Sequence, residues 1–299
     1  MIQTKLKGMG VALITPFKED ESVDYDALMR MVDYLLQNNA DFLCVLGTTA
    51  ETPTLTEEEK KTIKKMVIDR VNGRIPILLG VGGNNTRAIV ETLKNDDFTG
   101  VDAILSVVPY YNKPSQEGIY QHYKAIAEAT ELPIVLYNVP GRTASNISPA
   151  IVARLAADFE NIVAIKEAAG NVAQVAELYS VLPEEFTIYS GDDGLILPFM
   201  SVGATGLISV LSNIGGGILQ DVMQAYEDGR VREAAKLNAR MVPLANAMFI
   251  ETNPIPVKAA VTLVTGIDAG QPRLPLTPME DSYRSQLKQA LIDARLLSS

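Results

Sequence analysis

Short apolar runs alternate with longer amphipathic segments along most of the chain. The runs are rich in Val, Ile and Leu and hold few charged residues, as parallel strands do when helices cover both faces of their sheet. Eight runs follow this pattern, at residues 11–17, 42–49, 75–82, 103–111, 133–140, 162–168, 186–193 and 206–213. Eight strand–helix units predict an α/β fold that closes into a (β/α)8 TIM barrel.

Two of the intervening helices have recognisable first residues. Thr56 stands three residues before Glu59, so that a hydroxyl and a carboxylate can satisfy the free N–H groups of a first helical turn. Ser148 precedes Pro149, which places an N-cap residue before a proline at the first helical position. We therefore expect helices to begin directly after Thr56 and Ser148.

The C-terminal part of the chain has a different pattern. Residues 218–299 carry helical periodicity but no convincing strand. We expect a barrel over residues 1–217 that carries the active site, and a helical C-terminal extension over residues 218–299 packed on it. The uncharged stretch 194–220 is interrupted by Pro198 and several glycines, so we interpret it as helix, strand and loop, not as a membrane span.

A doubly wound sheet is the alternative architecture, and it predicts a glycine-rich phosphate loop after an early strand. The segment Gly80-Val-Gly-Gly-Asn-Asn85 lacks the third glycine of a dinucleotide fingerprint, and the sequence has no Walker A motif. Nucleotide chemistry therefore has no support, and the barrel is preferred.

Charge and composition limit the partners. The 36 acidic and 26 basic residues give a formal net charge of −10, a field that repels phosphate backbones and anionic lipids. Nucleic acid and membrane partners are not expected, although basic groups in a cleft can still bind an anionic substrate. The first ten residues lack the apolar core of a signal peptide, so we expect a cytoplasmic protein.

Two residue types are too scarce for several kinds of site. His122 is the only histidine and Cys44 the only cysteine, which excludes a multi-histidine zinc site, a cysteine-rich metal site and an intramolecular disulfide. We expect no metal. Cys44 stands within an apolar run, where a small buried hydrophobic residue is the expected role, and His122 is expected to be an ordinary helix residue.

Lys166 is the most informative charged residue. It follows Ile162-Val-Ala-Ile165 at the C-terminal end of a predicted buried strand, the end at which barrel enzymes hold their catalytic groups. Burial or a nearby cation lowers the pKa of a lysine and exposes the lone pair that attacks a keto acid to form an imine. Position alone also allows a buried ion pair with Glu51 or Glu167.

Polar residues follow several other predicted strands. Tyr137 closes the fifth run, Tyr111 closes the fourth, and Thr48 and Thr49 end the second. Hydroxyls and backbone N–H groups at these positions suit a proton relay or a bound carboxylate. Arg142, just after Tyr137, adds a planar cation that can bind a carboxylate in a bidentate way.

Several motifs in order along the chain make the sequence recognisable. They are Gly47-Thr-Thr-Ala-Glu-Thr52, Pro109-Tyr-Tyr-Asn-Lys-Pro-Ser-Gln-Glu-Gly118, Tyr137-Asn-Val-Pro-Gly-Arg-Thr143, Ile165-Lys-Glu-Ala168, Gly191-Asp-Asp193, Gly206-Leu-Ile-Ser209 and Asn253-Pro-Ile-Pro-Val-Lys258. Together they resemble the 4-hydroxy-tetrahydrodipicolinate (dihydrodipicolinate) synthases, a family of class I Schiff-base pyruvate lyases. The resemblance covers nearly the whole chain.

The resemblance implies an enzyme of the diaminopimelate and lysine pathway. It condenses pyruvate with L-aspartate-4-semialdehyde, without an external cofactor, through an imine on Lys166. By motif, Tyr137, Thr48 and Tyr111 would carry the proton relay, while Thr49 and Ile208 would hold pyruvate. Arg142 would bind the carboxylate of the semialdehyde. The family's usual assembly is a homotetramer of two dimers, in which the tyrosine matching Tyr111 reaches into the neighbouring subunit's site.

Two departures from the family concern the first motif and regulation. Ala50 replaces the usual glycine of Gly-Thr-Thr-Gly-Glu, which restricts the backbone beside the Thr pair. Many members are inhibited by lysine bound next to the tyrosine matching Tyr110. Where lysine-sensitive bacterial members place histidines this sequence has Glu57 and Lys60, and Ala88 replaces an acidic ligand, so we expect weak inhibition or none.

Two other functions remain open on sequence. N-acetylneuraminate lyases and the aldolases or dehydratases of keto-deoxy sugar acids share the lysine and the tyrosine, but Asn138-Val-Pro-Gly-Arg-Thr143 favours the synthase. A non-catalytic keto-acid-binding protein would keep the pocket without the relay.

Overall fold

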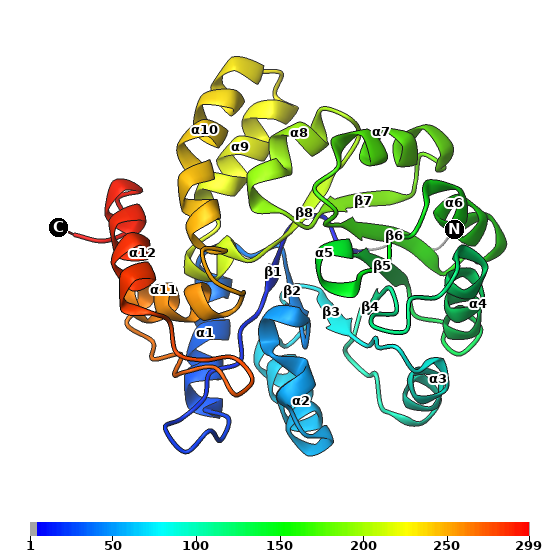
Figure 1. The fold of residues 1–299 in the computed structure, drawn as a ribbon, viewed down its shortest axis with the longest axis horizontal. Coiled ribbons are helices and arrows are strands. Elements are labelled where there is room, and N and C mark those ends of the chain that lie inside the picture. The colour runs from blue at the N-terminus through cyan, green and yellow to red at the C-terminus, as the bar shows by residue number, and fades with distance from the viewer. Residues whose placement is uncertain (1–4, 299) are drawn as a thin grey trace. The chain divides into compact units, whose positions relative to one another are not determined.

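The fold is a closed barrel of eight parallel strands in chain order, which confirms the predicted fold class (Figure 1). The computed structural model describes residues 5–298. The strands are β1 (Gly8–Ala12), β2 (Phe42–Val45), β3 (Ile77–Gly80), β4 (Ala103–Val107), β5 (Ile134–Asn138), β6 (Ile162–Glu167), β7 (Thr187–Ser190) and β8 (Gly206–Ser209). All are almost entirely buried, as the continuous apolar runs require.

At least one α-helix lies between each strand and the next, and further helices follow β8. The α-helices are α1 (Tyr25–Gln37), α2 (Glu57–Val71), α3 (Thr86–Asn95), α4 (Gln116–Ala127), α5 (Pro140–Thr143), α6 (Pro149–Asp158), α7 (Val172–Val181), α8 (Ile196–Met200), α9 (Gly217–Glu227), α10 (Val231–Ala247), α11 (Ile255–Thr265) and α12 (Asp281–Asp293). Short 3₁₀ helices are η1 (Thr48–Ala50), η2 (Thr52–Thr54), η3 (Asp193–Leu195) and η4 (Leu211–Ile214).

The two predicted helix starts are confirmed. Thr56 Oγ1 accepts a hydrogen bond from Glu59 N at 3.2 Å, and Glu59 Oε2 accepts one from Thr56 N at 2.8 Å. Ser148 caps α6, which begins at Pro149. Residues 194–220 fold into short helices, β8 and the first turn of α9. No helix within residues 5–298 is long and apolar enough to span a membrane.

The strands end earlier than the apolar runs predicted. β2 stops at Val45 and residues 48–50 form η1, and β4 stops at Val107 although the run continues to Tyr111. β1 begins at Gly8, three residues before the predicted start. The loops that follow the strands are themselves largely buried, so hydrophobicity alone does not mark the last hydrogen-bonded residue.

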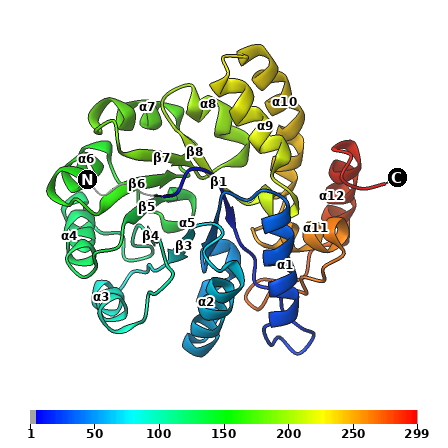
Figure 2. The ribbon, with the colours of Figure 1, turned by 180° about the vertical axis from the view of Figure 1, so that it is seen from behind.

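Contacts between residues divide the chain into two compact units. Among the described residues, unit 1 contains residues 5–8 and Pro76–Ile208, with β3 to β7 and all of β8 except Ser209. Unit 2 contains Met9–Ile75 and residues 209–298, with β2, all of β1 except Gly8, and the helices α1, α2 and α9 to α12. In unit 2, α9 packs on α10 and α1 packs on α2 (Figure 2). The division into residues 1–217 and 218–299 stays a prediction.

Candidate functional site

Lys166 and Tyr137 lie side by side near the ends of β6 and β5. The two residues are register partners in the parallel pairing of these strands, so their side chains extend from the same face of the sheet. Lys166 Nζ lies 4.5 Å from the centre of the Tyr137 ring. Both side chains are buried, with Lys166 only 6 % exposed. The predicted position of Lys166 at a strand end is confirmed, and a phenol stands next to its amine.

Asn138 and Glu167, the next residues on β5 and β6, face the opposite side of the sheet, toward the helices of unit 1. The buried carboxylate of Glu167 accepts hydrogen bonds from Asn138 Nδ2 at 2.9 Å, Gln174 Nε2 at 3.0 Å and Ala169 N at 2.7 Å. Asn138 Nδ2 also donates to Asn146 Oδ1 at 2.7 Å. Burial raises the pKa of Glu167, and the amide donors oppose that rise. These hydrogen bonds fix the ends of β5 and β6. Because neighbouring residues of a strand point to opposite faces, they also keep Tyr137 and Lys166 directed into the barrel.

The alternative that Lys166 is neutralised in an ion pair does not fit the structure. Glu51 has Lys258 as its partner, with Oε1 and Nζ 2.9 Å apart, and Glu167 is held by amides. Both carboxylates that the sequence offered to Lys166 therefore have other partners.

Small and apolar residues stand near Lys166. A side chain on Gly191 would lie 3.1 Å from Lys166 Cε and 2.6 Å from Ala168 Cβ, so the absence of a Cβ leaves room for the lysine stem. Ile208 is fully buried in β8, which pairs with β7, and β7 in turn pairs with β6 at Lys166. Unit 1 thus gathers an amine, a phenol and a buried isoleucine on neighbouring strands, with a glycine beside the lysine stem.

Two further predicted residues of unit 1 lie on loops. Arg142 is an exposed residue of α5, four residues after the end of β5. Tyr111 is 89 % exposed with φ +71°, a left-handed conformation that is uncommon for a tyrosine. The prediction that Tyr111 closes a strand is wrong, because β4 ends four residues earlier and the loop carries the ring outward.

In unit 2, Thr48 and Thr49 form the first turn after β2. They belong to η1, and Thr49 Oγ1 accepts a hydrogen bond from Asn253 Nδ2 at 3.0 Å. Ala50 O accepts from Thr15 Oγ1 at 2.8 Å. The residue of this turn with a left-handed backbone is Glu51, at φ +55°, not Ala50. An alanine in place of glycine therefore meets no positive-φ strain.

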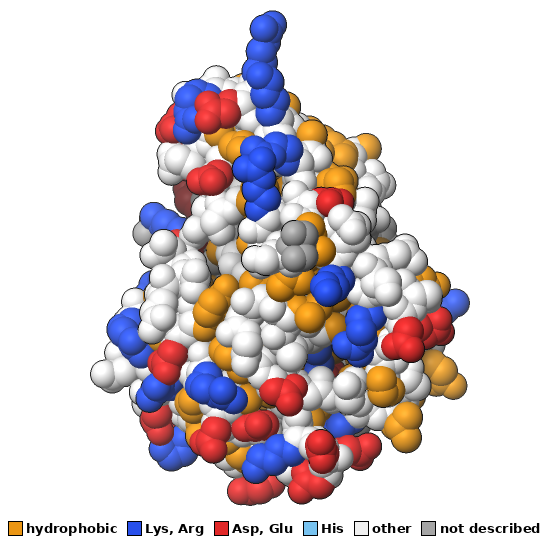
Figure 3. Space-filling model, turned by 90° about the vertical axis from the view of Figure 1, so that its left-hand side faces the viewer, with side chains coloured by type: hydrophobic (Ala, Val, Ile, Leu, Met, Phe, Trp, Pro, Cys, Tyr) orange, Lys and Arg blue, Asp and Glu red, His pale blue; other side chains and the backbone are white. Residues whose placement is uncertain are grey.

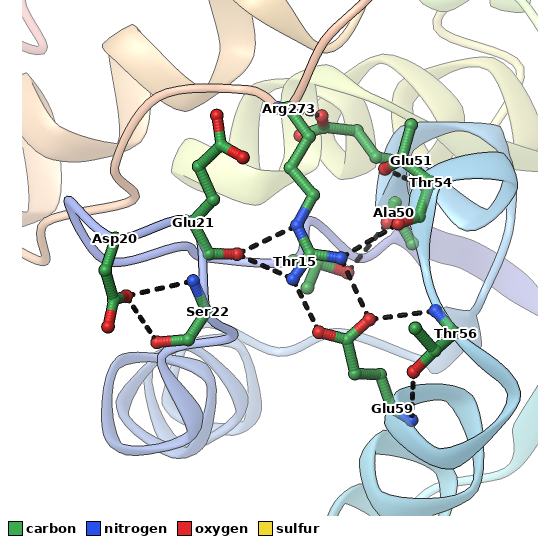
Figure 4. Close-up of polar contacts among 10 residues, drawn as sticks. All are labelled: Thr15, Asp20, Glu21, Ser22, Ala50, Glu51, Thr54, Thr56, Glu59 and Arg273. Atoms are coloured by element: carbon green, nitrogen blue, oxygen red, sulfur yellow. Dashed lines mark hydrogen bonds and ion pairs between the residues drawn. The ribbon is translucent and has the colours of Figure 1, made fainter.

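An ionic cluster supports this turn, and Figure 4 shows the part of it that contains Glu51, Glu59 and Arg273. Lys258 Nζ donates to Glu51 Oε1 at 2.9 Å and to Gln271 O at 3.1 Å, and Arg273 N donates to Glu51 Oε2 at 2.9 Å. Burial lowers the pKa of Lys258 to about 8, even though Glu51 acts in the opposite direction. The Arg273 guanidinium binds Glu59 and holds the pKa of that carboxyl at about 2.

The sequence did not reveal most of these supporting residues. Asn253 and Lys258 stood in a recognised motif without a role, and Arg273 stood in no motif. From the sequence, Glu51 and Glu167 are expected only as ion-pair partners of Lys166. The contacts of Glu167 with Asn138 and Gln174 cannot be predicted from the nearby sequence, because they depend on which strands and helices are neighbours in the fold.

The single cysteine and the single histidine play no part in this arrangement. Cys44 is buried in β2, and His122 is buried in α4, where its Nδ1 lies 2.8 Å from Thr86 Oγ1. Among residues 5–298 no cluster of three or more His, Cys, Asp or Glu side chains could hold a metal ion. Glu57 and Lys60 form an ion pair with each other at 2.8 Å, and the response to lysine stays a prediction.

Acidic and basic side chains are interspersed over the face drawn in Figure 3, without an extended basic area. Together with the net charge of −10, that face offers little attraction to a phosphate backbone.

The chain is similar to known proteins over nearly its whole length. The chain is 56% identical to the 4-hydroxy-tetrahydrodipicolinate synthase of Phocaeicola vulgatus over 99% of both chains. It is 45% identical to the enzyme of that name from Bacillus subtilis, over 95% of this chain and 97% of the relative. The dihydrodipicolinate synthase structure from Thermotoga maritima superimposes with a TM-score of 0.94 at 40% identity, covering 98% of this chain and 100% of that one.

The match extends to the level of a family model. A structure of the synthase from Cyanidioschyzon merolae with lysine bound superimposes with a TM-score of 0.95 at 40% identity, over 99% of this chain and 100% of the other. Residues 5–294 match the model of the dihydrodipicolinate synthetase family. The chain therefore belongs to the dihydrodipicolinate synthetase family.

Proposed function

We propose that this protein condenses pyruvate with L-aspartate-4-semialdehyde to 4-hydroxy-tetrahydrodipicolinate, in the diaminopimelate and lysine pathway. The observation that carries the proposal is the buried amine of Lys166 beside the Tyr137 ring, at the end of a barrel strand, in a chain of this family. Glu51 and Glu167, the two carboxylates considered as ion-pair partners of this amine, are bound elsewhere. The amine is thereby left for a carbonyl substrate.

The chemistry proceeds by imine formation and carbon–carbon coupling. Lys166 Nζ adds to the keto carbon of pyruvate, and loss of water gives the imine. Removal of a methyl proton gives an enamine, whose carbon attacks the aldehyde of the second substrate. The substrate's amine then attacks the imine carbon, closes the ring and releases Lys166. One water is lost overall and no electron is transferred, so the reaction requires no external cofactor.

The proton transfers need groups that both donate and accept. We assign them to Tyr137, Thr48 and Tyr111 by motif, and the contact of Tyr137 with Lys166 supports its role. Thr49 and Ile208 hold pyruvate, and Arg142 receives the carboxylate of the semialdehyde through its guanidinium fork. The exposed position of Arg142 suits capture of a substrate that arrives second.

The proposed assembly is a homotetramer of two dimers in the cytoplasm. Tyr111 supports the dimer, because a tyrosine that is 89 % exposed on a left-handed backbone has its ring available to another subunit. Sedimentation over a concentration series tests the assembly. Tyr111→Ala is expected to reduce turnover without changing the strands around Lys166.

The decisive experiment is borohydride reduction in the presence of pyruvate, followed by peptide mass mapping. We expect one reduced adduct, on Lys166, and neither adduct nor turnover in Lys166→Ala. Labelling at another lysine contradicts the assignment. Turnover of semialdehyde compared with N-acetylneuraminate separates the synthase from its lyase relatives, and saturable pyruvate binding without turnover identifies a non-catalytic protein.

A further inference from the structure

The turn after β2 is held by residues that stand more than 200 positions later in the chain. Thr49, Glu51 and their contacts Asn253, Lys258 and Arg273 all belong to unit 2. The sequence separations of the three contacts are 204, 207 and 222 residues. Segments after β8 therefore determine the conformation of a turn that follows the second strand.

The contact to Thr49 has a direction with chemical consequences. Asn253 Nδ2 donates to Thr49 Oγ1 at 3.0 Å, and both residues are buried. A hydroxyl that accepts from an amide keeps its own hydrogen to donate to another group. A carboxylate, which only accepts, is the complementary partner for that hydrogen.

The backbone of the same turn is held in a conformation that needs support. Glu51 adopts φ +55° and ψ +34°, which is unfavourable for a residue with a side chain. Each of its carboxylate oxygens has one donor at 2.9 Å, Lys258 Nζ on one side and Arg273 N on the other. These two contacts fix the end of η1 and so fix the direction of the Thr49 hydroxyl.

Arg273 is itself anchored on three sides, as Figure 4 shows. Its guanidinium donates to Thr54 O at 2.8 Å, to Glu21 O at 2.8 Å and to Glu59 Oε2 at 2.9 Å. The same group lies 4.4 Å above the centre of the Phe17 ring. The backbone N–H that reaches Glu51 therefore belongs to a residue whose side chain is held by hydrogen bonds and a ring contact.

We propose that Asn253, Lys258 and Arg273 are positioning residues for pyruvate: Asn253 makes Thr49 a hydrogen-bond donor, and the cluster of Glu51, Lys258 and Arg273 aims it. The proposal rests on the proposed function, in which Thr49 holds pyruvate, and it assigns the Thr49 hydroxyl to the carboxylate of that substrate. It assigns a catalytic purpose to the C-terminal segments, which supply no reacting atom.

The first test is a double-mutant cycle on steady-state kinetics. Asn253→Ala and Thr49→Val are each expected to raise KM for pyruvate about tenfold, the loss of one directed hydrogen bond, with kcat changed much less. The double variant is expected to be no worse than Thr49→Val, because Asn253 acts only through that hydroxyl. Asn253→Asp, which can only accept from Thr49 once ionised, is expected to raise KM further.

The outcomes separate this proposal from the one on which it rests. Wild type without turnover and without a borohydride adduct on Lys166 contradicts the proposed function and this inference together. Wild type with both, but with unchanged KM in Asn253→Ala or additive effects in the double variant, contradicts only the positioning role. Val222→Ala, a core change in α9, serves as the control for general loss of stability and is expected to leave KM unchanged.

A second test uses pH. The groups that act on Lys258 are Glu51, Arg273 and Asp268, and its ammonium lies 4.2 Å above the Phe17 ring. Above about pH 8, its pKa, Lys258 loses its charge and the Glu51 contact weakens, so KM for pyruvate is expected to rise. Lys258→Arg stays charged and is expected to move that rise to higher pH. An identical KM–pH profile in this variant contradicts the role of the cluster.

Discussion

Glu51 and Glu167 are both buried glutamates beside proposed catalytic residues, but their carboxylates are stabilised in different ways. Glu51, in unit 2, contacts the ammonium of Lys258 and one backbone N–H. Glu167, in unit 1, accepts from neutral donors, which include the side-chain amides of Asn138 and Gln174 and the backbone N–H of Ala169. The cost of burying the Glu51 carboxylate is offset by a charged partner, and that of burying Glu167 by the dipoles of neutral N–H groups.

The difference fits the neighbours of each glutamate. A cation paired with Glu167 would lie near Lys166, because the two residues are adjacent in the chain. It would compete for substrate carboxylates and change the pKa of the Lys166 amine. Neutral amides hold the strand ends without adding charge there. Because these donors only partly oppose the effect of burial, the pKa of Glu167 is raised. No reacting amine is proposed at Glu51, which follows the Thr48–Thr49 turn. There an ion pair can hold the turn with stronger hydrogen bonds than neutral donors provide. The printed partners of Glu51 include a cation, whereas the printed partners of Glu167, on the strand that carries Lys166, are neutral.

The largest effect should come from the reacting side of this comparison. Tyr137→Phe removes the hydroxyl of the ring that lies beside Lys166 Nζ, and we expect kcat to fall by roughly 10²–10⁴-fold, the usual contribution of general acid–base catalysis. Pyruvate binding should change far less. Thr48→Val should act in the same direction. Stopped-flow and steady-state rates measure both, and near-normal kcat in the two variants would refute the relay.

On the scaffolding side, the largest change is Lys258→Met. It leaves the Glu51 carboxylate buried without its cation, which typically costs about 3–5 kcal/mol of unfolding free energy. Denaturant unfolding monitored by circular dichroism measures this loss. The double variant Glu51→Gln/Lys258→Met removes both charges and should recover a large part of it. Equal losses in the single and double variants would show that the pair does not govern stability.

The sequence was sufficient for the fold and for the position of Lys166. Parallel strands buried on both faces are continuous apolar runs, so eight of them with helices between predicted the barrel. Capping at Thr56 and Ser148 depends on neighbours within three residues and was equally legible. Lys166 stood out because a charged residue interrupts an apolar run at the strand end that barrels use for catalysis.

The supporting contacts could not be predicted in the same way. Lys258 was recognisable only as part of a motif, and nothing local assigns it to Glu51 at a separation of 207 residues. Periodicity reports which face of an element is buried, not which distant side chain it meets. The ends of strands were overestimated for a related reason: Thr49 and Ala50 are buried like strand residues although they form a 3₁₀ turn.

A smaller kinetic effect is expected at the entrance group. Arg142→Ala should lower kcat/KM for the semialdehyde by an amount equivalent to about 1.5–3 kcal/mol, the usual loss when a hydrogen bond to a charged group is removed. Imine formation with pyruvate should be little affected. Parallel titrations of the two substrates make the measurement, with Arg154→Ala, which breaks a surface ion pair with Glu117, as the control. Unchanged kcat/KM for the semialdehyde would exclude the role.

Glu167→Gln tests the neutral half of the comparison. The new amide presents an N–H₂ group to donors from Asn138, Gln174 or Ala169, and leaving one buried donor unsatisfied costs about 1–3 kcal/mol. Removal of the buried charge offsets part of that cost, so we expect a smaller loss than for Lys258→Met. The urea midpoint at pH 7 measures it. A larger loss of unfolding free energy than for Lys258→Met would show that the neutral hydrogen bonds of Glu167 contribute more stability than the ion pair of Glu51.

The smallest expected effect concerns His122, a buried base in unit 1 that has a hydroxyl as its partner and no carboxylate. Burial lowers the pKa of His122 from 6.5 to about 4, and its Nε2 has no hydrogen-bond partner among the described residues. The unfolded chain therefore takes up a proton near pH 6.5 while the folded chain does not until about pH 4. Stability from this group is fully present above pH 6.5 and is lost as pH falls from there toward pH 4.

Between pH 7 and pH 5 the loss of unfolding free energy from His122 should be no more than about 2 kcal/mol. His122→Gln removes the titration and should flatten that part of the stability profile, measured by urea unfolding at half-unit pH steps. Because the chain has one histidine, any slope that remains in the variant belongs to carboxylates. An unchanged profile in the variant would show that His122 takes up its proton equally well in the folded state.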